Sequence, residues 1–317
     1  MACARCSVPD RFGPSSVVLP DAPRRVRRDR PAMAATIVVG VDGAPGSRDA
    51  LALARTLQPL LGAELVAAAV DPRGLRSPAG HGEPPPEARG LRTVVVRAAS
   101  VARGLRAVVA REDAVLLVAG TSHRTGLARH SRLAGGERLL AAPCCAVAFA
   151  PPGYAERADR RVRVVGAGFD GGPTAAAAVR AAAALAQRAC GTVRVVAFTE
   201  PSLAPTVSAA VGGGPPLAFA GGSIRRHLDA AVAELLEELP DAVRACGRVE
   251  LGEPGHQRLE RADAVDLLVL GSQGRGALDR AVFGSVAEQV VHASPAPVLV
   301  LAPGTAEPLL GAVAAAA

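Results

Sequence analysis

Short apolar runs alternate along the chain with segments in which apolar residues recur every three or four positions. Continuous apolar runs are typical of parallel strands buried on both faces, and the wider spacing is typical of helices that cover such strands. The expected strands are residues 35–41, 64–70, 114–120, 146–150, 162–169, 192–198, 265–271 and 297–301. The expected helices are residues 50–61, 174–189 and 224–239, and one that opens at 285. This alternation predicts an α/β fold with a parallel sheet.

The second half of this pattern repeats the first. Thr36–Gly43 is a β-branched run that ends in Asp-Gly, and Val162–Gly171 is another. Each run leads into a helical pattern that closes on a glycine, Gly62 or Gly191, as helix C-termini prefer. We therefore predict two tandem doubly wound (Rossmann-like) domains. The predicted boundaries are 33–151 for the first domain, 159–303 for the second and 304–317 for a C-terminal tail.

Residues 1–32 show neither period and are rich in Pro and Arg. We expect a disordered basic extension there, unless translation starts at Met33, just before the first strand. Seven Arg and three Asp give this segment +4 of the formal net charge of +7. Every one of the 36 basic residues is Arg, and aromatic content is only 2%. Base-stacking surfaces need several aromatics, so we predict no nucleic-acid partner. No apolar run reaches the roughly 18 residues of a membrane span, so we predict no membrane partner.

The cysteines do not form a metal-binding pattern. Cys3 and Cys6 form a CxxC pair, but the chain has no second such pair and no histidine at zinc spacing. Cys144 and Cys145 are interpreted as small residues at the start of a strand rather than as a redox pair. We therefore predict no metal site and a reducing, cytoplasmic location.

Two loops of the second half have the composition of a phosphate-binding site. The first presents Gly166, Gly168, Phe169 and Asp170 after the opening strand. The second presents Gly271, Gly274, Arg275, Gly276, Gly284 and Ser285, and then Val286 within the next helix. Glycines let the backbone approach a ligand closely, and amides at a helix N-terminus point at anions. Asp170 can accept hydrogen bonds from ribose hydroxyls.

The spacing Gly271-x2-Gly274-x9-Gly284-Ser285, together with the strand ending in Asp170, resembles the nucleotide-binding signature of the universal stress protein family. The resemblance covers residues about 35–303. It implies a five-stranded parallel sheet in each domain and, in ATP-binding members of the family, bound ATP, with or without Mg²⁺. It also implies that Asp170 meets the ribose and adenine side and that Phe198 flanks the adenine, where the family commonly has a small aliphatic residue. The signature glycines and Ser285 would then hold the phosphates. Family members pair their last strands across a twofold, which implies an intramolecular pseudo-dimer here and leaves a homodimer open.

The first half departs from this signature. Gly120 is kept, but His123 stands at the second glycine, and Leu133 and Ala134 stand at the Gly-Ser pair. We therefore expect the first domain not to bind ATP, and we expect Asp42 to cap the helix that follows it.

The leading hypothesis is an ATP-binding regulatory protein of the stress response that uses its second domain and is not an enzyme. No catalytic residue is predicted, because no Ser, His and acid arrangement and no lysine-containing phosphate loop occurs. One alternative is a nucleotide-independent interaction scaffold of the same fold. An ATP-consuming enzyme would need a general base that the sequence does not offer.

Overall fold

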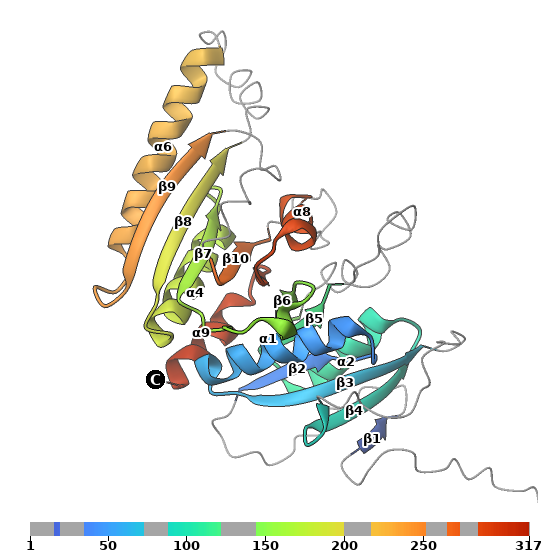
Figure 1. Ribbon diagram of the computed structural model, residues 1–317. Coiled ribbons are helices and arrows are strands. Elements are labelled where there is room, and N and C mark those ends of the chain that lie inside the picture. Colours follow the sequence, from blue (N-terminus) through green and yellow to red (C-terminus); the bar gives the residue numbers. More distant parts are fainter. Residues whose placement is uncertain are drawn as a thin grey trace, which may run out of the picture.

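The strands of the described chain join in one continuous sheet. The computed structural model describes residues 16–19, 35–72, 88–121, 144–199, 217–251, 265–272 and 285–316. Within these residues the sheet has eleven strands in the order β1-β4-β3-β2-β5-β6-β11-β10-β7-β8-β9 (Figure 1). Neighbouring strands run parallel except β6 and β11, which pair antiparallel. The α/β class predicted from the sequence is confirmed.

The elements of the two halves have the following bounds. Up to the connection between the halves they are β1 (Ser16–Leu19), β2 (Thr36–Gly40), α1 (Pro45–Leu61), β3 (Glu64–Pro72), β4 (Arg92–Ala98), α2 (Val101–Glu112), β5 (Leu116–Gly120), β6 (Ala146–Ala150) and the short 3₁₀ helix η3 (Tyr154–Glu156). After it they are β7 (Val164–Phe169), α4 (Pro173–Arg188), β8 (Thr192–Thr199), α6 (Leu217–Glu237), β9 (Arg244–Leu251), β10 (Leu267–Gly271), α8 (Ser285–Ala293), β11 (Val298–Leu301) and α9 (Ala306–Ala315).

The same strand order occurs on both sides of the antiparallel pair. It runs β4-β3-β2-β5-β6 on one side and β9-β8-β7-β10-β11 on the other. In each case the chain builds outward from the first strand and then returns to its other side, so the order reverses between β2 and β5 and between β7 and β10. Open α/β sheets bind ligands at such reversals, beyond the carboxyl ends of the strands.

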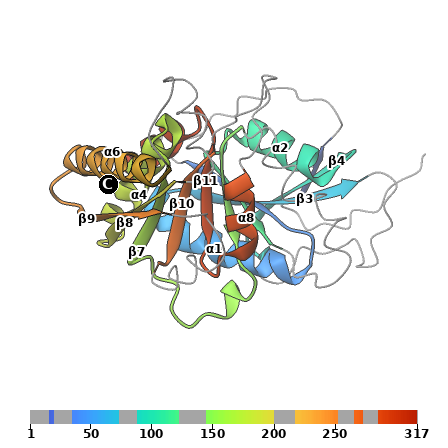
Figure 2. The ribbon, with the colours of Figure 1, turned by 90° about the horizontal axis from the view of Figure 1, so that it is seen from above.

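Helices cover both faces of the sheet because successive strand residues point to opposite sides. Ile37 and Val39 belong to a buried cluster that includes residues of α1, α4, α6 and α9, whereas Val38 belongs to a second cluster that includes residues of α2 and α8. In Figure 2, β10 and β11 run between α4 and α8. Continuous apolar strands are therefore buried on both faces, as their composition predicts. Among the described helices, none is both long and apolar enough to span a membrane.

Helix ends follow local backbone chemistry, with one correction. Both α1 and α4 start on a proline, which suits the first helical position. Gly62 ends α1 in the left-handed region with φ 53°, as predicted. After α4, however, the left-handed residue is Cys190, with φ 52°, and not Gly191. Gly191 is a glycine for a different reason, because a Cβ there would lie 2.4 Å from the carbonyl oxygen of Arg163.

Two terminal segments are more ordered than the sequence analysis expected. Ser16–Leu19 forms β1, which pairs in parallel with β4, so the expectation of an extension without regular structure is wrong for these four residues. The cause is that the outer side of β4 offers unpaired backbone groups to a short β-branched run. The expected tail at 304–317 contains α9. Leu309, Ala312 and Val313 of α9 are buried against the core, and this spacing of three and four defines a packed helix face.

The segment between the halves, residues 151–163, is here called the connector, and it is held against α1. Both carboxylate oxygens of Asp49 accept backbone N–H groups, from Gly153 at 3.2 Å and from Ala155 at 2.8 Å. The buried Tyr154 donates its hydroxyl to Thr56 at 3.3 Å. Arg157 lies over the Tyr154 ring, 5.3 Å from its centroid, and donates to the carbonyl of residue 295. The connector therefore contacts both halves.

Candidate nucleotide-binding site

The candidate site lies where the strand order of the second half reverses. β7 and β10 pair directly, with Ala167 beside Val269 in the register. Because the two strands are parallel, their carboxyl ends at Phe169 and Gly271 reach the same edge of the sheet. The turn with Asp170 and the loop that starts at Ser272 therefore leave the sheet side by side.

A hydrogen-bonded turn positions Asp170. Its Oδ1 accepts the backbone N–H of Gly172 at 2.8 Å, and Gly171 between them has φ 85°. A positive φ is inexpensive only for glycine, so the Asp-Gly pair follows from the turn itself. Pro173 then begins α4. The turn leaves the Asp170 side chain exposed beside the end of β10.

The first half contains the same turn with one difference. Asp42 accepts the N–H of Ala44 at 2.9 Å, and Gly43 has φ 79°. The Ser47 hydroxyl also donates to the Asp42 carboxylate at 2.7 Å and accepts the Asp42 N–H at 2.9 Å. The N-cap residue of α1 is Ala44, so the expectation that Asp42 caps the helix is wrong, and its carboxylate binds the first turn instead.

The residue of the second half that matches Ser47 is Ala175, which has no hydroxyl. The hydrogen bonds between Ser47 and Asp42 therefore have no counterpart at Ala175, and Asp170 takes part in a further interaction of its own. The difference between the two turns is visible in the sequence, because Ser47 and Ala175 each follow the aspartate of their own repeat by five positions.

Gly271 is required by packing within the fold. A Cβ at Gly271 would lie 2.6 Å from the backbone carbon and oxygen of Thr174, in the first turn of α4. Gly120, at the matching place in the first half, has the same constraint against Gly46, at 2.1 Å. The strand end and the helix start therefore touch in both halves. The family signature links Gly271 to phosphates, but the contact of Gly271 with α4 already accounts for the glycine.

Ser272, directly after Gly271, was missed by the sequence analysis. It is buried, and its N–H donates to the carbonyl of Leu301 at 2.7 Å. Thr121 occupies the same place in the first half and donates to Ala150 at 3.0 Å. These are backbone hydrogen bonds that almost any residue could form, so no side-chain signal in the sequence marks them. They fix the start of the loop against the last strand of each half.

The remaining predicted residues divide into three groups. Phe169 is 6% exposed and lies in the core, so its side chain is not available to a ligand, whereas Gly168 is half-buried beside Leu270. Phe198 lies at the carboxyl end of β8 and pairs with Glu250 of β9, and Ser285 and Val286 begin α8; for these three the structure describes the backbone alone. Outside the described residues lie Gly274, Arg275, Gly276 and Gly284 of the second half, and His123, Leu133 and Ala134 of the first.

The two cysteines before β6, Cys144 and Cys145, differ in the pKa of their thiols. Cys144 and Cys145 are free thiols, and Cys145 is buried. A hydrogen bond from the Cys145 thiol lowers the pKa of Cys144 to about 7, and the same bond together with burial raises the pKa of Cys145. No metal-binding group of three or more His, Cys, Asp or Glu side chains occurs in the part of the chain that the structure describes.

The parallel sheet, the order reversal and the Asp-Gly turn define a Rossmann-like α/β protein. Residues 161–302 match the model of the universal stress protein family. A universal stress protein of Mycolicibacterium smegmatis is 39% identical over 67 residues, which cover 21% of this chain and 22% of that protein. One of Mycobacterium tuberculosis H37Rv is 29% identical over 193 residues, which cover 59% of this chain and 62% of that protein. The match thus spans less than two thirds of either relative.

Solved structures show the same fold at lower identity. A universal stress protein from Archaeoglobus fulgidus has a TM-score of 0.52 and 16% identity, and the match covers 85% of this chain and 98% of that one. A protein of unknown function from Pseudomonas aeruginosa PAO1 has a TM-score of 0.55 and 18% identity, covering 89% of this chain and 98% of that one. The second half of this chain is thus similar to the universal stress protein family, whose model matches somewhat less than half of the chain.

Proposed function

We propose that the chain is a nucleotide-responsive regulatory protein whose second half binds ATP. The observation that supports the proposal is the direct pairing of β7 with β10, which puts Asp170 and the residues at the end of β10, Gly271 and Ser272, at one edge of the sheet. Asp170 would bind the ribose hydroxyls and Phe198 would flank the adenine. The amides of Gly274, Arg275 and Gly284, with Ser285 and Val286 at the start of α8, would bind the phosphates.

The first half differs from the second at the positions that this proposal assigns to nucleotide binding. Its Asp42 is engaged by Ser47, and its loop lacks three of the four signature residues. We therefore propose one nucleotide for each chain. No catalytic role belongs to the proposal, since the described residues of the site include no general base beside Asp170.

The proposed organisation is two domains, at 33–151 and 159–303, that form an intramolecular pseudo-dimer. Its support is the antiparallel pairing of β6 with β11, in which Ala148 lies beside Leu299, and the matching strand order on either side. A second chain could associate without changing this arrangement. The free thiols of the four described cysteines support a reducing, cytoplasmic environment.

The first test compares ATP binding by wild type and by the double variant Gly284→Leu/Ser285→Ala, using isothermal titration calorimetry. This variant places the first-half residues in the second-half loop. We expect at least about a tenfold loss of affinity, because hydrogen bonds to charged groups contribute roughly 1.5–3 kcal/mol each. Equal affinity in the two proteins would refute the site assignment. ATP-free purified protein with no thermal shift on adding ATP would instead favour the nucleotide-independent scaffold.

A second test uses the repeat as its own control. Asp170→Asn and Asp42→Asn keep an oxygen acceptor in the same turn and remove only the carboxylate charge. We expect ATP affinity to fall roughly tenfold in Asp170→Asn, because a charged acceptor is lost at the ribose, and to stay unchanged in Asp42→Asn. Equal losses in both variants would contradict the proposed asymmetry.

A further inference from the structure

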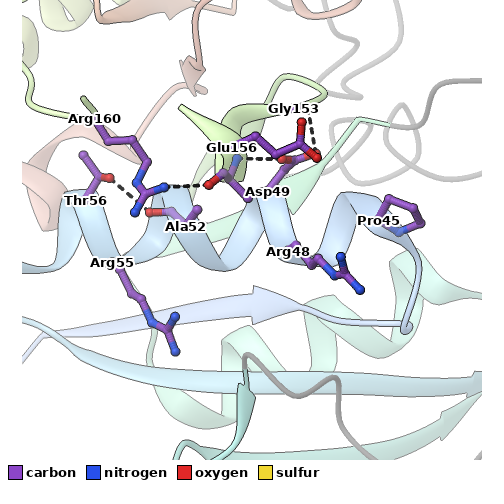
Figure 3. Close-up of a pocket in the computed structure, with 10 residues that line it drawn as sticks. Pro45, Arg48, Asp49, Ala52, Arg55, Thr56, Gly153, Glu156 and Arg160 are labelled. Atoms are coloured by element: carbon purple, nitrogen blue, oxygen red, sulfur yellow. Dashed lines mark hydrogen bonds between the residues drawn. The ribbon is translucent and has the colours of Figure 1, made fainter. Parts of the chain in front are cut away.

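A separate cavity lies between α1 and the connector, in the first half of the chain. It has a volume of about 660 Å³, and its walls are one stripe of α1 and residues 153–160 (Figure 3). All residues that line it belong to the described chain. This cavity, here called the connector pocket, is distinct from the candidate nucleotide site, which lies at the reversal of strand order in the second half.

Three arginines line the connector pocket, two from α1 and one from the connector. Arg48 and Arg55 project from the helix, and Arg160 lies on the connector side (Figure 3). The Arg160 guanidinium donates to the carbonyl of Ala155 at 2.7 Å and to that of Arg157 at 3.4 Å. Seven positions along an α-helix amount to about 10 Å, so Arg48 and Arg55 start two turns apart on one side of α1. Arg48 and Arg55 have other interactions, but a guanidinium carries five N–H donors and can bind more than one partner.

Two carboxylates also line the pocket, and they differ in exposure. Asp49 is 6% exposed, and its two oxygens accept the connector amides of Gly153 and Ala155. The Asp49 carboxylate is therefore engaged in hydrogen bonds that hold the connector against α1. Glu156 is exposed on the 3₁₀ helix and carries the remaining negative charge of the lining. The lining therefore presents three cationic groups against one exposed acid.

The corresponding face of the second half has none of this chemistry. In α4, alanines occupy the positions of Arg48, Asp49 and Arg55, at 176, 177 and 183. That helix packs against α9. The arginines are therefore not a general feature of the repeat. They occur only where the connector leaves an open cavity beside the helix.

We propose that the connector pocket binds a small organic anion through phosphate or carboxylate groups. Arginine forks match both groups in a bidentate geometry. The methyl group of Ala52 on the helix stripe gives the carbon part of the ligand an apolar surface. The proposal goes beyond nucleotide binding in the second half and does not depend on it.

The chain provides its own probe for this site. Tyr154 is the only tyrosine, and the chain has no Trp. Its ring is buried in the connector between Gly153 and Ala155, both of which line the pocket. Tyrosine emission therefore reports on the connector alone. We would titrate pyrophosphate, which does not absorb at the excitation wavelength, into the full chain at constant ionic strength, and repeat the titration with succinate as the carboxylate arm.

We expect a saturable change of Tyr154 emission with at least one of the two anions. Arg48→Ala and Arg55→Ala should each weaken binding roughly two- to fivefold, as expected for one partly exposed charge, and Glu156→Gln should strengthen it by a similar factor. The matched control is Arg180→Ala, which removes an exposed arginine from α4 that pairs with Glu238 at 3.0 Å. It should leave the affinity unchanged. Thermal melts confirm that each variant is folded.

Opposite shifts in the arginine and glutamate variants cannot arise from a merely structural effect. The proposal is overturned if emission does not saturate with either anion, or if Arg180→Ala weakens binding as much as Arg48→Ala does. ATP affinity, measured by calorimetry on the same variants, should equal that of wild type. Failure of nucleotide binding in the second half therefore has a different signature from failure at the connector pocket.

Discussion

The hydrogen bonds of Asp49 allow a stability prediction that can be worked through from the structure. Asp49→Ala removes the acceptor of two backbone N–H groups, those of Gly153 and Ala155. A hydrogen bond to a charged group contributes roughly 1.5–3 kcal/mol, and the two would sum to about 3–6 kcal/mol. Gly153 is exposed, so water can replace one of the partners. We therefore expect a loss of about 2–4 kcal/mol in the free energy of unfolding.

The assay is urea denaturation followed by far-UV circular dichroism and by Tyr154 fluorescence. The matched control is Asp71→Ala, whose carboxylate lies 3.7 Å from Arg97 in an exposed pair. Exposed ion pairs contribute about 0–1 kcal/mol, so this control should barely move the midpoint. If Asp49→Ala destabilises the protein no more than Asp71→Ala does, the connector is not anchored through Asp49. An early fluorescence transition in Asp49→Ala, ahead of the loss of helix signal, would show local release of the connector.

Three further predictions concern packing and proton affinity. Gly271→Ala should destabilise the protein by about 1–3 kcal/mol in chemical denaturation, because the new Cβ would overlap the backbone of α4. Gly311→Ala, where a Cβ would have nothing within 4 Å, should instead stabilise α9 by roughly 0.5–1 kcal/mol. Equal effects of the two substitutions would contradict the close approach at Gly271. Leu309→Ala should cost about 2–4 kcal/mol, since the side chain is 1% exposed, and a change below 0.5 kcal/mol would mean that α9 is not docked. The lowered pKa makes Cys144 about half thiolate near pH 7 and mostly thiolate above it, so its rate of iodoacetamide alkylation should fall to half near pH 7 and decline further in acid, while the buried Cys145 resists. Replacing Cys145 with alanine should move that midpoint upward, and an unchanged midpoint would exclude the thiol hydrogen bond as its cause.

Elements that depend on local sequence preferences can be predicted from the sequence alone. The β-branched runs and the Asp-Gly turns at Asp42 and Asp170 occur where the pattern places them, whereas α1 begins at Pro45, five positions before the expected start at residue 50. Gly62 is predictable as well, because a left-handed helix end has a local preference for glycine. The same reasoning fails at Gly191, because Cys190 takes the left-handed conformation there. Gly191 is required instead because a Cβ would collide with the backbone of Arg163, which is distant in the sequence.

The sequence by itself determined the α/β class, the repeat and the candidate nucleotide loop, since each depends on periodicity or on short-range spacing. Only the tertiary structure decided that Phe169 is a core residue, that Gly271 touches α4 and that Asp49 holds the connector. Asp49 and Ala155 are more than 100 positions apart. A contact of that kind leaves no period in the chain, because it arises when two surfaces meet after the sheet has formed. The same is true of the connector pocket, whose arginines appear in the sequence as ordinary exposed helix residues and become one site only through the path of the chain between the halves.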